Sequence, residues 1–276
     1  MYSALLVIIY LAFISLGLPD TLLGSAWPQM HIELNASLSS AGIITMIISL
    51  GTVISSLFSD RLNIKLGTGK VTAISVLMTA VALLGFSLSH SFIILCVLAV
   101  PYGLGAGAVD AALNNYVALH YSSKHMSWLH CFWGVGASIG PYIIGTCMAH
   151  GLGWRGGYSV ISVLQFTLTA ALFITLPLWK KVENSENNVI NGKNERTQEE
   201  PQERKAKSLS EVLHIKGVIY ILFAFFCYSA VEQTTTLWCA SYLVLNRSID
   251  SNIAAKFAAF FYIGITFGRA DLLQTS

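Results

Sequence analysis

Charge is the scarcest property of this 276-residue chain: Asp, Glu, Lys and Arg make up 11% of it, against 54% hydrophobic residues. The mean hydropathy is +0.64. The sequence also lacks the period-two alternation that marks the strands of a membrane barrel. Backbone hydrogen bonds in lipid must be made within the segment, and without a closed barrel only helices achieve this. The composition therefore predicts an all-α, polytopic membrane protein.

Patterns for metal binding, redox chemistry and catalysis are missing as well. The five cysteines lie in apolar stretches and form no Cys-x-x-Cys pair, so we interpret them as small buried hydrophobic residues. His120, His125 and His130 are five residues apart, a spacing that does not share one helical face, so no metal site is expected. His-Glu-x-x-His pairs and nucleophile elbows are absent. We expect neither an enzyme nor a protein that needs a cofactor or binds nucleic acid.

Long apolar stretches are what the sequence does contain. About 20 apolar residues are needed for a helix to cross the hydrocarbon core. Eight stretches meet that need: Tyr2–Ser25, Ser39–Ser59, Thr72–Leu88, Phe92–Leu119, Met126–His150, Gly157–Trp179, Gly217–Leu245 and Ile253–Gly268. The first has no basic n-region and no small-residue cleavage site, so we interpret it as a retained helix and not as a signal peptide.

The basic residues between these stretches are distributed unevenly. With the N-terminus inside, the inner connections hold Arg61, Lys65, Lys70, Lys124, Lys180, Lys181, Lys193, Arg196, Arg204, Lys205, Lys207 and Lys216. The outer connections hold Arg155, Arg247 and Lys256. Because cytoplasmic loops of membrane proteins are enriched in Lys and Arg, this asymmetry predicts a cytoplasmic N-terminus.

Residues 180–216 form one long polar tract, rich in Asn, Glu, Gln, Lys and Arg. Such a composition cannot bury a core, so we expect a flexible cytoplasmic linker. The tract divides the chain into a six-helix half (1–179), the linker (180–216) and a partial second half (217–276). A weak repeat supports this division, because Asp20 precedes Trp27 in the first helix much as Glu232 precedes Trp238 in the seventh.

Two halves of six helices are the layout of many membrane transporters, yet residues 217–276 supply only two helices. After Arg269 the sequence continues as neither a typical loop nor a further helix. We therefore expect a truncation or a reading-frame change near Arg269, and little or no transport by such a 276-residue product. A genuine eight-helix protein remains the alternative.

Three carboxylates interrupt the apolar stretches: Asp20, Asp110 and Glu232. An ionisable group at the centre of a bilayer costs about 2.5–3.5 kcal/mol on insertion scales. We therefore expect the three carboxylates to have a function. The leading interpretation is that they bind a polar solute or a proton that the protein transports.

The connection between the second and third helices carries a short charged motif with glycines. Asp60 and Arg61 begin it, and Gly67 and Lys70 end it. Such a loop lets two helices turn tightly and pair charges at the cytoplasmic face. A generic positive-inside loop is the plainer alternative.

Small residues and a polar pair share the fourth helix. Gly103, Gly105 and Gly107 favour close helix packing, and their spacing does not match a dinucleotide-binding loop. Asp110 and Asn114 are four residues apart and therefore lie on one helical face. This face either lines a polar cavity or bonds a neighbouring helix.

The fifth helix combines a bend motif with two candidate binding residues. Gly136 and Gly140 favour close approach of backbones, and Pro141 permits a bend. His130 and Trp133 project near one another, and aromatic faces stack on sugar rings or other flat apolar faces. An ordinary interhelix hydrogen bond is the competing role for His130.

The seventh helix contains the most polar mid-helix run of the chain. Glu232 and Gln233 precede three threonines and Trp238. Because transporters hold solutes at polar, easily unwound segments near the middle of the membrane, this run is a candidate solute site. Packing explains the threonines but not Glu232.

Together these motifs resemble one branch of the major facilitator superfamily, the fucose permease and glucose/galactose transporter group, over nearly the whole chain. The most specific pieces are Pro19–Leu23, Gly103–Asn114 and His130–Gly136. The loop after the second helix also resembles a signature of the superfamily, with Ser56 in place of a glycine. The resemblance implies roles in solute binding and proton coupling for Asp20 and Asp110.

Two departures leave the solute open: the branch has Glu at the Asp110 position and an amide where His130 stands. The Gly136–Pro141 segment also resembles a motif of drug/proton antiporters. We expect a monomer in the lipid bilayer of the cell membrane that takes up a small polar solute, by resemblance a sugar, together with protons. An exporter of hydrophobic compounds and a solute sensor without transport are the alternatives.

Overall fold

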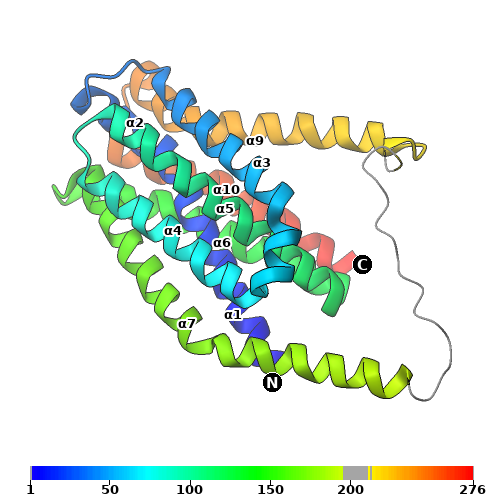
Figure 1. The fold of residues 1–276 in the computed structure, drawn as a ribbon. Helices are drawn as coiled ribbons and strands as arrows, with labels where there is room; N and C mark the ends of the chain where they lie inside the picture. Colours follow the sequence, from blue (N-terminus) through cyan, green and yellow to red (C-terminus); the bar gives the residue numbers. More distant parts are fainter. Residues whose placement is uncertain (1, 195–210, 212, 276) are drawn as a thin grey trace.

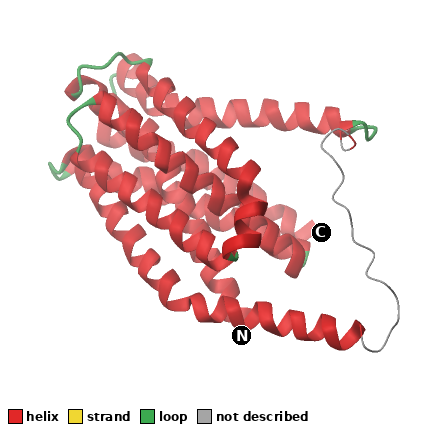
Figure 2. Cartoon of the chain, viewed as in Figure 1, coloured by secondary structure: helices red, strands yellow, loops and turns green. Residues whose placement is uncertain are grey.

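The computed structural model describes residues 2–194, 211 and 213–275, and in these ranges the chain forms helices joined by short turns, without strands (Figure 2). In chain order the helices are α1 (Tyr2–Asp20), α2 (Leu22–Glu33), α3 (Ser40–Leu66), α4 (Thr68–Leu88), α5 (Phe92–His120), α6 (Ser123–Ala149), α7 (Gly153–Asn194), α9 (Val218–Arg247) and α10 (Ser251–Thr275). The predicted all-α fold is confirmed.

Seven helical segments of the described chain are long and apolar enough to cross a membrane. They are Leu5–Glu33, Ser40–Leu66, Thr68–Leu88, Phe92–His120, Ser123–Ala149, Gly153–Trp179 and Val218–Arg247. The first comprises most of α1 together with α2, interrupted at Thr21. The predicted eighth span, Ile253–Gly268, lies within α10, which is not among these seven and carries Asn252 and Lys256.

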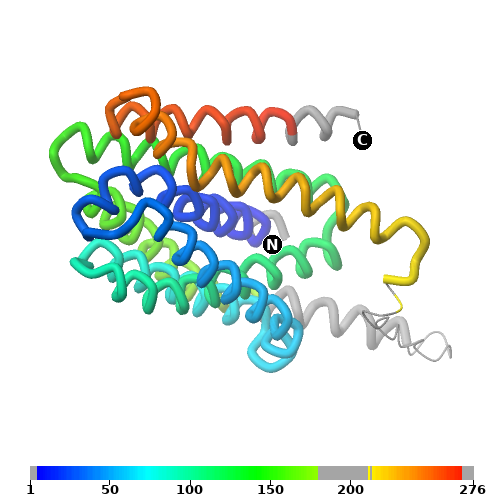
Figure 3. The backbone as a smooth tube through the Cα atoms, turned by 90° about the horizontal axis from the view of Figure 1, so that it is seen from above, coloured from blue at the N-terminus to red at the C-terminus, as the bar shows by residue number. Residues whose placement is uncertain are grey.

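The helices form one bundle around α1, which contacts α4, α5, α6 and α7. α3 packs against α5, α10 lies along α6, and α9 contacts α2 and α10. The connections α2–α3, α4–α5, α6–α7 and α9–α10 gather at one end of the bundle, and the α3–α4 turn lies at the other end (Figure 1). Seen from above, α10 and the α3–α4 pair lie on opposite sides (Figure 3). The predicted inner and outer connections thus lie at opposite ends.

Two glycines of α5 bring its backbone close to α3. A Cβ atom on Gly103 would lie 2.3 Å from the Ile48 carbonyl oxygen, and one on Gly107 would lie 2.4 Å from that of Thr52. Gly105 faces the opposite neighbour, α4, where a Cβ atom would lie 2.7 Å from the carbonyl oxygen of Ser75. The glycine run therefore lets α5 pack tightly between two helices.

Glycines of α6 bring it close to α1 in the same way. A Cβ atom on Gly136 would lie 2.1 Å from the Ile14 carbonyl oxygen, and one on Gly140 would lie 2.3 Å from that of Leu18. α6 continues as a helix through Pro141 to Ala149. The two glycines hold α6 against the part of α1 that leads to Asp20.

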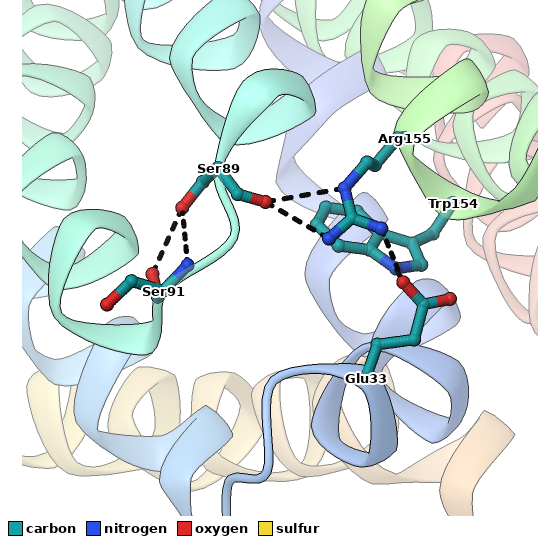
Figure 4. A network of polar contacts seen from close by, with 5 residues as sticks. All are labelled: Glu33, Ser89, Ser91, Trp154 and Arg155. Atoms are coloured by element: carbon teal, nitrogen blue, oxygen red, sulfur yellow. Dashed lines mark hydrogen bonds and ion pairs between the residues drawn. The ribbon is translucent and has the colours of Figure 1, made fainter.

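A cluster of polar contacts joins three elements at the end of the bundle where α2 ends (Figure 4). Trp154 donates its indole N–H to the Glu33 carboxylate at 3.0 Å, and Arg155 forms an ion pair with the same carboxylate. Nε and Nη2 of Arg155 donate to the backbone carbonyl of Ser89 at 3.3 and 3.1 Å. The start of α7 is thereby joined to the end of α2 and to the α4–α5 turn.

The predicted polar linker, residues 180–216, lies partly outside the described residues. α7 continues as a helix to Asn194, beyond the end of the predicted span at Trp179. Residues 195–210 and 212 are outside the described chain. Gly217, with a φ of 98°, precedes α9 in the left-handed region that favours glycine. The proposed division into 1–179, 180–216 and 217–276 stays a prediction.

The charged motif does not form a loop from Asp60: it covers the last turns of α3 and the first turn of α4, with a tight turn at Gly67 between them. Gly67 adopts a φ of 81° between α3 and α4, which explains why glycine stands there. Asp60, Arg61 and Lys70 are exposed, and the Arg61 guanidinium lies 5.9 Å from the centre of the Phe58 ring. The structure describes these side chains and shows no ion pair between them, so the predicted pairing of charges at this loop is not observed.

The start of α9 extends away from the other helices (Figure 1). Each residue from Ile219 to Tyr228 is exposed, although most are large and apolar. Exposed apolar side chains such as Met46 and Leu57 also cover the outer face of α3. Apolar exposure of this extent is what a surface in contact with lipid requires.

Candidate solute-binding cavity

A cavity of about 650 Å³ lies inside the bundle, lined by residues of α1, α2, α3, α4, α5, α6, α7 and α9. Its polar lining residues are Asp20, Thr45, Ser49, Thr52, Tyr102, Asp110, His130, Trp133, Tyr158, Ser229, Glu232, Gln233 and Thr236. Phe13, Phe86 and Phe225 add three further aromatic rings. A concave site of this size with a few polar groups among apolar walls is typical of small-molecule binding.

One face of α9 supplies the polar lining predicted for the seventh helix. Phe225, Ser229, Glu232, Gln233 and Thr236 line the cavity, and their spacings of three and four residues place them on one helical face. α9 is continuous from Val218 to Arg247. The run described as easily unwound is therefore helical, because three threonines lower helix propensity only slightly.

The interruption lies instead in the first membrane span, beside Asp20. α1 ends at Asp20 and α2 begins at Leu22. Pro19 lacks an N–H group, so the carbonyl of Ser15, four residues earlier, loses its usual helical donor. The Gln165 amide of α7 donates to that carbonyl and accepts a bond of 2.7 Å from the Ser15 hydroxyl. This buried pair satisfies the backbone group that Pro19 releases.

Asp20 lies at the centre of the bundle and is nevertheless accessible, because it faces the cavity. The Tyr102 hydroxyl of α5 donates to one carboxylate oxygen at 3.1 Å, and the Trp133 indole N–H of α6 donates to the other at 2.9 Å. One carboxylate thus accepts hydrogen bonds from two further helices.

Asp110 lines the cavity from α5, two helical turns beyond Tyr102. The Asn114 side-chain amide donates to the Asp110 carboxylate at 2.9 Å and to its backbone carbonyl at 3.0 Å. The shared face predicted for Asp110 and Asn114 is therefore observed. Asn114 itself is not part of the cavity wall, so its direct effect falls on Asp110.

The three carboxylates meet in one cavity, although they come from three different helices. Glu232 is half-buried in the cavity wall, and both Glu232 and Asp110 act electrostatically on Asp20. No lysine or arginine of the described chain lines the cavity. The described wall of the cavity therefore combines three carboxylates with one imidazole, that of His130.

The remaining predicted contact residues divide between the cavity and the core. His130 lines the cavity with its ring edge-on to Phe13 at 6.1 Å, and Gln233 lines it from α9. Trp238 is partly buried against the hydrophobic core and does not line the cavity. The structure thus brings Asp20, Asp110, His130, Trp133, Glu232 and Gln233 together, and leaves Asn114 and Trp238 outside the wall.

Several lining residues were missed in the sequence, among them Tyr102 and three hydroxyl-bearing residues of α3. Tyr102 donates to Asp20, yet a tyrosine within an apolar helix gives no signal of its own. Thr45, Ser49 and Thr52 line the cavity from α3. Their spacing of four and three residues forms a hydroxyl stripe on one helical face, and this periodicity was the signal that could have identified them.

Tyr262 connects α10 to the cavity wall. Its hydroxyl donates to the Thr236 hydroxyl of α9, and its ring meets that of Trp133 edge-on at a centroid distance of 6.3 Å. α10 thus supports two lining helices, α6 and α9, and its described side chains, up to Gly268, do not line the cavity.

A helical membrane bundle with a polar cavity at its centre is typical of membrane transport proteins. The family model of the Major Facilitator Superfamily matches residues 9–271, and the chain belongs to this superfamily, whose members are transporters and not enzymes.

Several curated proteins are similar to the chain. "Bypass of stop codon protein 6" of Saccharomyces cerevisiae is 24% identical over 94% of this chain and 54% of that protein. "Uncharacterized transporter y4wD" of Sinorhizobium fredii is 26% identical over 41% of this chain and 31% of that protein. "Synaptic vesicle glycoprotein 2B" of Rattus norvegicus is 25% identical over 62% of this chain and 26% of that protein. The chain therefore spans about half the length of the first relative and less of the others.

Proposed function

We propose that the chain forms the solute cavity of a secondary transporter that takes up a small polar solute with protons by alternating access. The polar cavity at the centre of the bundle is the observation that carries this proposal. The resemblance to fucose permease-like proteins favours a sugar as the solute. Asp20 and Asp110 are the proposed proton-binding groups, and His130, Trp133 and Gln233 are among the proposed solute contacts.

The contacts of Asp20 suggest how a proton could affect helix packing. Both carboxylate oxygens accept hydrogen bonds, one from Tyr102 and one from Trp133. Hydrogen bonds to an ionised acceptor are stronger than those to a neutral one. A proton on Asp20 would therefore weaken the link between α1, α5 and α6, and the bundle could rearrange more easily.

The packing of α9 favours a cavity that opens at the end of the bundle where α9 begins. A Cβ atom on Gly24 would lie 2.0 Å from the Thr236 carbonyl oxygen, so α2 and α9 touch backbone to backbone on one side of the cavity. Near its first residue, Val218, α9 departs from the bundle (Figure 1), and residues 219–228 are exposed. With the predicted cytoplasmic N-terminus, this arrangement corresponds to a cavity open toward the cytoplasm.

The sharpest test on this chain is proton-linked binding, because the chain matches only about half of its first relative. Hexoses are titrated into the purified protein by calorimetry in two buffers with different ionisation enthalpies. We expect binding accompanied by net proton uptake, and loss of that uptake in Asp20→Asn or Asp110→Asn. The surface variant Asp250→Asn is the matched control, because Asp250 is exposed outside the cavity.

Uptake into vesicles then tests transport itself. Because little or no transport is expected from the 276-residue product alone, labelled sugars are offered to vesicles that contain a transporter in which this cavity is joined to a second half of six helices. Accumulation that depends on an inward proton gradient is the result that supports symport. Binding without proton exchange and uptake that ignores the gradient would contradict the proposal.

Export of hydrophobic compounds is the second candidate function, and the aromatic lining favours it. Phe13, Phe86 and Phe225 contribute apolar rings to the cavity wall. These rings have no polar group to bond a sugar hydroxyl, and they suit a hydrophobic compound. Drug resistance on expression, together with an absence of sugar accumulation, would select this alternative.

A further inference from the structure

The contacts that join α9 and α10 to the helices α1–α7 differ in extent. Near the start of α10, a Cβ atom on Gly145 of α6 would lie 2.6 Å from the Asn252 carbonyl oxygen. Further along the same two helices, a Cβ atom on Gly134 would lie 2.3 Å from the Thr266 hydroxyl oxygen. α9 touches α2 at Gly24 and departs from the bundle toward its first residue (Figure 1). α10 is therefore anchored along α6, and α9 is the helix with the freer end.

Tyr262 of α10 lies where α6, α9 and α10 meet. Its side chain is buried, with a relative exposure of 2%. The hydroxyl donates to the Thr236 hydroxyl of α9, which in turn donates to the Glu232 carbonyl at 2.7 Å. The ring meets that of Trp133 of α6 edge-on, at a centroid distance of 6.3 Å and an interplanar angle of 73°. One buried side chain thus contacts α6 through its ring and α9 through its hydroxyl.

Trp133 connects Tyr262 to Asp20. Its indole N–H donates to the Asp20 carboxylate at 2.9 Å, while its ring contacts Tyr262. Because the indole is one rigid ring system, a change in the direction of its N–H also moves the surface that faces Tyr262. The charges of Asp20 and Glu232 also reach the Tyr262 hydroxyl. The state of Asp20 therefore acts on Tyr262 both through a chain of contacts and through its charge.

We propose that Tyr262 is a positioning residue that transmits the charge of Asp20 to α9, through Trp133 on one side and Thr236 on the other. The proposal rests on the proposed function, because it specifies how a proton on Asp20 reaches α9. An ionised Asp20 holds the Trp133 N–H through a charge-assisted bond, and the indole then supports Tyr262 against α9. A proton on Asp20 weakens that bond, so Tyr262 and α9 are held less tightly. The contact between Tyr262 and Thr236 is the element whose two states, made and broken, the proton biases.

The test is a double-mutant cycle that is read out on α9 and needs no solute. Asp20→Asn removes the charge that a proton would neutralise, and Tyr262→Phe removes the hydroxyl but keeps the ring. The readout is the rate at which Cys239 of α9, which is partly buried, reacts with a maleimide in the purified full chain in detergent. The rate is measured on the Cys239 peptide by mass spectrometry, and two proteins are compared at each pH of a series. Cys227 is the internal control, because it lies on the same helix and is already exposed.

The expected result is a loss of additivity between the two substitutions. We expect Asp20→Asn to raise the Cys239 rate at least about threefold in the unaltered chain and less than about 1.5-fold in the Tyr262→Phe protein. No effect of Asp20→Asn in the unaltered chain at any pH would overturn the proposal. An equal factor with and without the Tyr262 hydroxyl would also overturn it, because a merely structural role of Tyr262 predicts independent effects.

Variants of Thr236 test the same link from the side of α9. Thr236→Val removes the acceptor of the Tyr262 hydroxyl and is expected to abolish the effect of Asp20→Asn on Cys239, whereas Thr236→Ser is expected to retain it. An effect that persists in the Thr236→Val protein overturns the proposal, even where the Tyr262→Phe protein does not fold.

Tyr142→Phe is the matched control for the loss of a tyrosine hydroxyl. Tyr142 lies on the same contact between α6 and α10, with the Lys256 nitrogen 5.5 Å from the centre of its ring, and it is outside the cavity wall. We expect the effect of Asp20→Asn to be unchanged in the Tyr142→Phe protein. Its loss there would overturn the specific role of Tyr262.

The outcomes separate this inference from the proposed function. Proton-linked binding of a hexose, together with an undiminished effect of Asp20→Asn in the Tyr262→Phe protein, would support symport and reject the role of Tyr262. An effect that depends on Tyr262, without proton-linked binding of any hexose, would support the link between Asp20 and α9 and reject sugar symport.

Discussion

Asp20 receives contacts from several parts of the cavity wall. Its two oxygens accept hydrogen bonds from Tyr102 and Trp133, and the charges of Asp110 and Glu232 both reach it. Tyr102 is buried and bonded to Asp20, so its hydroxyl fixes the orientation of the carboxylate. The orientation of the Asp20 carboxylate therefore depends on two uncharged donors, Tyr102 and Trp133.

Replacing Tyr102 by Phe removes one of the two donors to Asp20 and keeps the ring. A hydrogen bond to a charged group contributes about 1.5–3 kcal/mol to stability, so we expect thermal stability to fall by up to that amount, and solute binding to weaken because Asp20 loses a donor that orients it. Calorimetric titration and thermal unfolding in detergent measure the two effects. Tyr142→Phe is the control, because Tyr142 is an exposed tyrosine of α6 outside the cavity wall. Equal effects of the two substitutions would contradict the role given to Tyr102.

Gln165 supports the site from behind the cavity. It is buried and bonds both the hydroxyl and the backbone carbonyl of Ser15, the carbonyl that Pro19 leaves without a helical donor. A buried polar group without a partner costs about 1–3 kcal/mol, and Gln165→Leu is expected to destabilise the protein by that amount. Thr167→Val on the same helix is the control, because Thr167 is exposed and bonds only its own helix. Thermal unfolding of the two variants checks this, and a Gln165→Leu protein as stable as the control would refute it.

At the residue scale, the sequence predicted the carboxylates and missed their partners for one physical reason. Asp20, Asp110 and Glu232 are costly in an apolar segment, so their presence alone is informative. A tyrosine or threonine costs little there, and its role depends on which face of the helix meets the cavity. Trp238 shows the same limit, because spacing along the chain does not reveal that it turns toward the core.

At the scale of the helices, glycines determine how closely neighbours approach. The contact between α2 and α9 depends on Gly24, where an added Cβ would lie 2.0 Å from the Thr236 carbonyl oxygen. Backbone atoms cannot move aside as a flexible side chain can. The two helices would therefore have to separate to admit even one methyl group.

Gly24→Ala is accordingly expected to destabilise the bundle by about 1–3 kcal/mol and to loosen the contact between α2 and α9. Gly42→Ala in α3 is the matched control, because a Cβ atom there would meet nothing within 4 Å. Thermal unfolding measures the stability, and the accessibility of the partly buried Cys239 to a thiol reagent reports on the α9 packing. Similar unfolding temperatures for the two variants would show that α2 and α9 do not rely on this approach.

The helices themselves were predictable because apolar length is a strong signal, whereas their ends were not. α3 extends to Leu66 although the apolar stretch ends near Ser59, since polar residues continue a helix beyond the lipid without cost. α7 continues to Asn194 for the same reason. The interruption at Thr21 was not predicted, because Pro19 marks a weak point in a helix without showing which other helix will satisfy the freed carbonyl.

At the scale of the whole molecule, successive connections between helices lie at alternate ends of the bundle. The distribution of basic residues among these connections therefore predicts which end faces the cytoplasm. Lys70 is exposed at the start of α4, and Asp250 is exposed in the turn between α9 and α10. These two positions belong to the two opposite ends of the bundle (Figure 1). The positive-inside rule assigns the end with Lys70 to the cytoplasm.

A cysteine placed at each position tests this orientation directly in intact cells. In a Cys227→Ser background, which removes the exposed native thiol of α9, we expect Asp250→Cys to react with a membrane-impermeant maleimide from outside the cell. Lys70→Cys is expected to react only after the membrane is opened or inverted. The pair is its own control, because each variant must be labelled from one side and protected from the other. Labelling of Lys70→Cys from outside would reverse the orientation, and with it the assignment of the open end of the cavity to the cytoplasm.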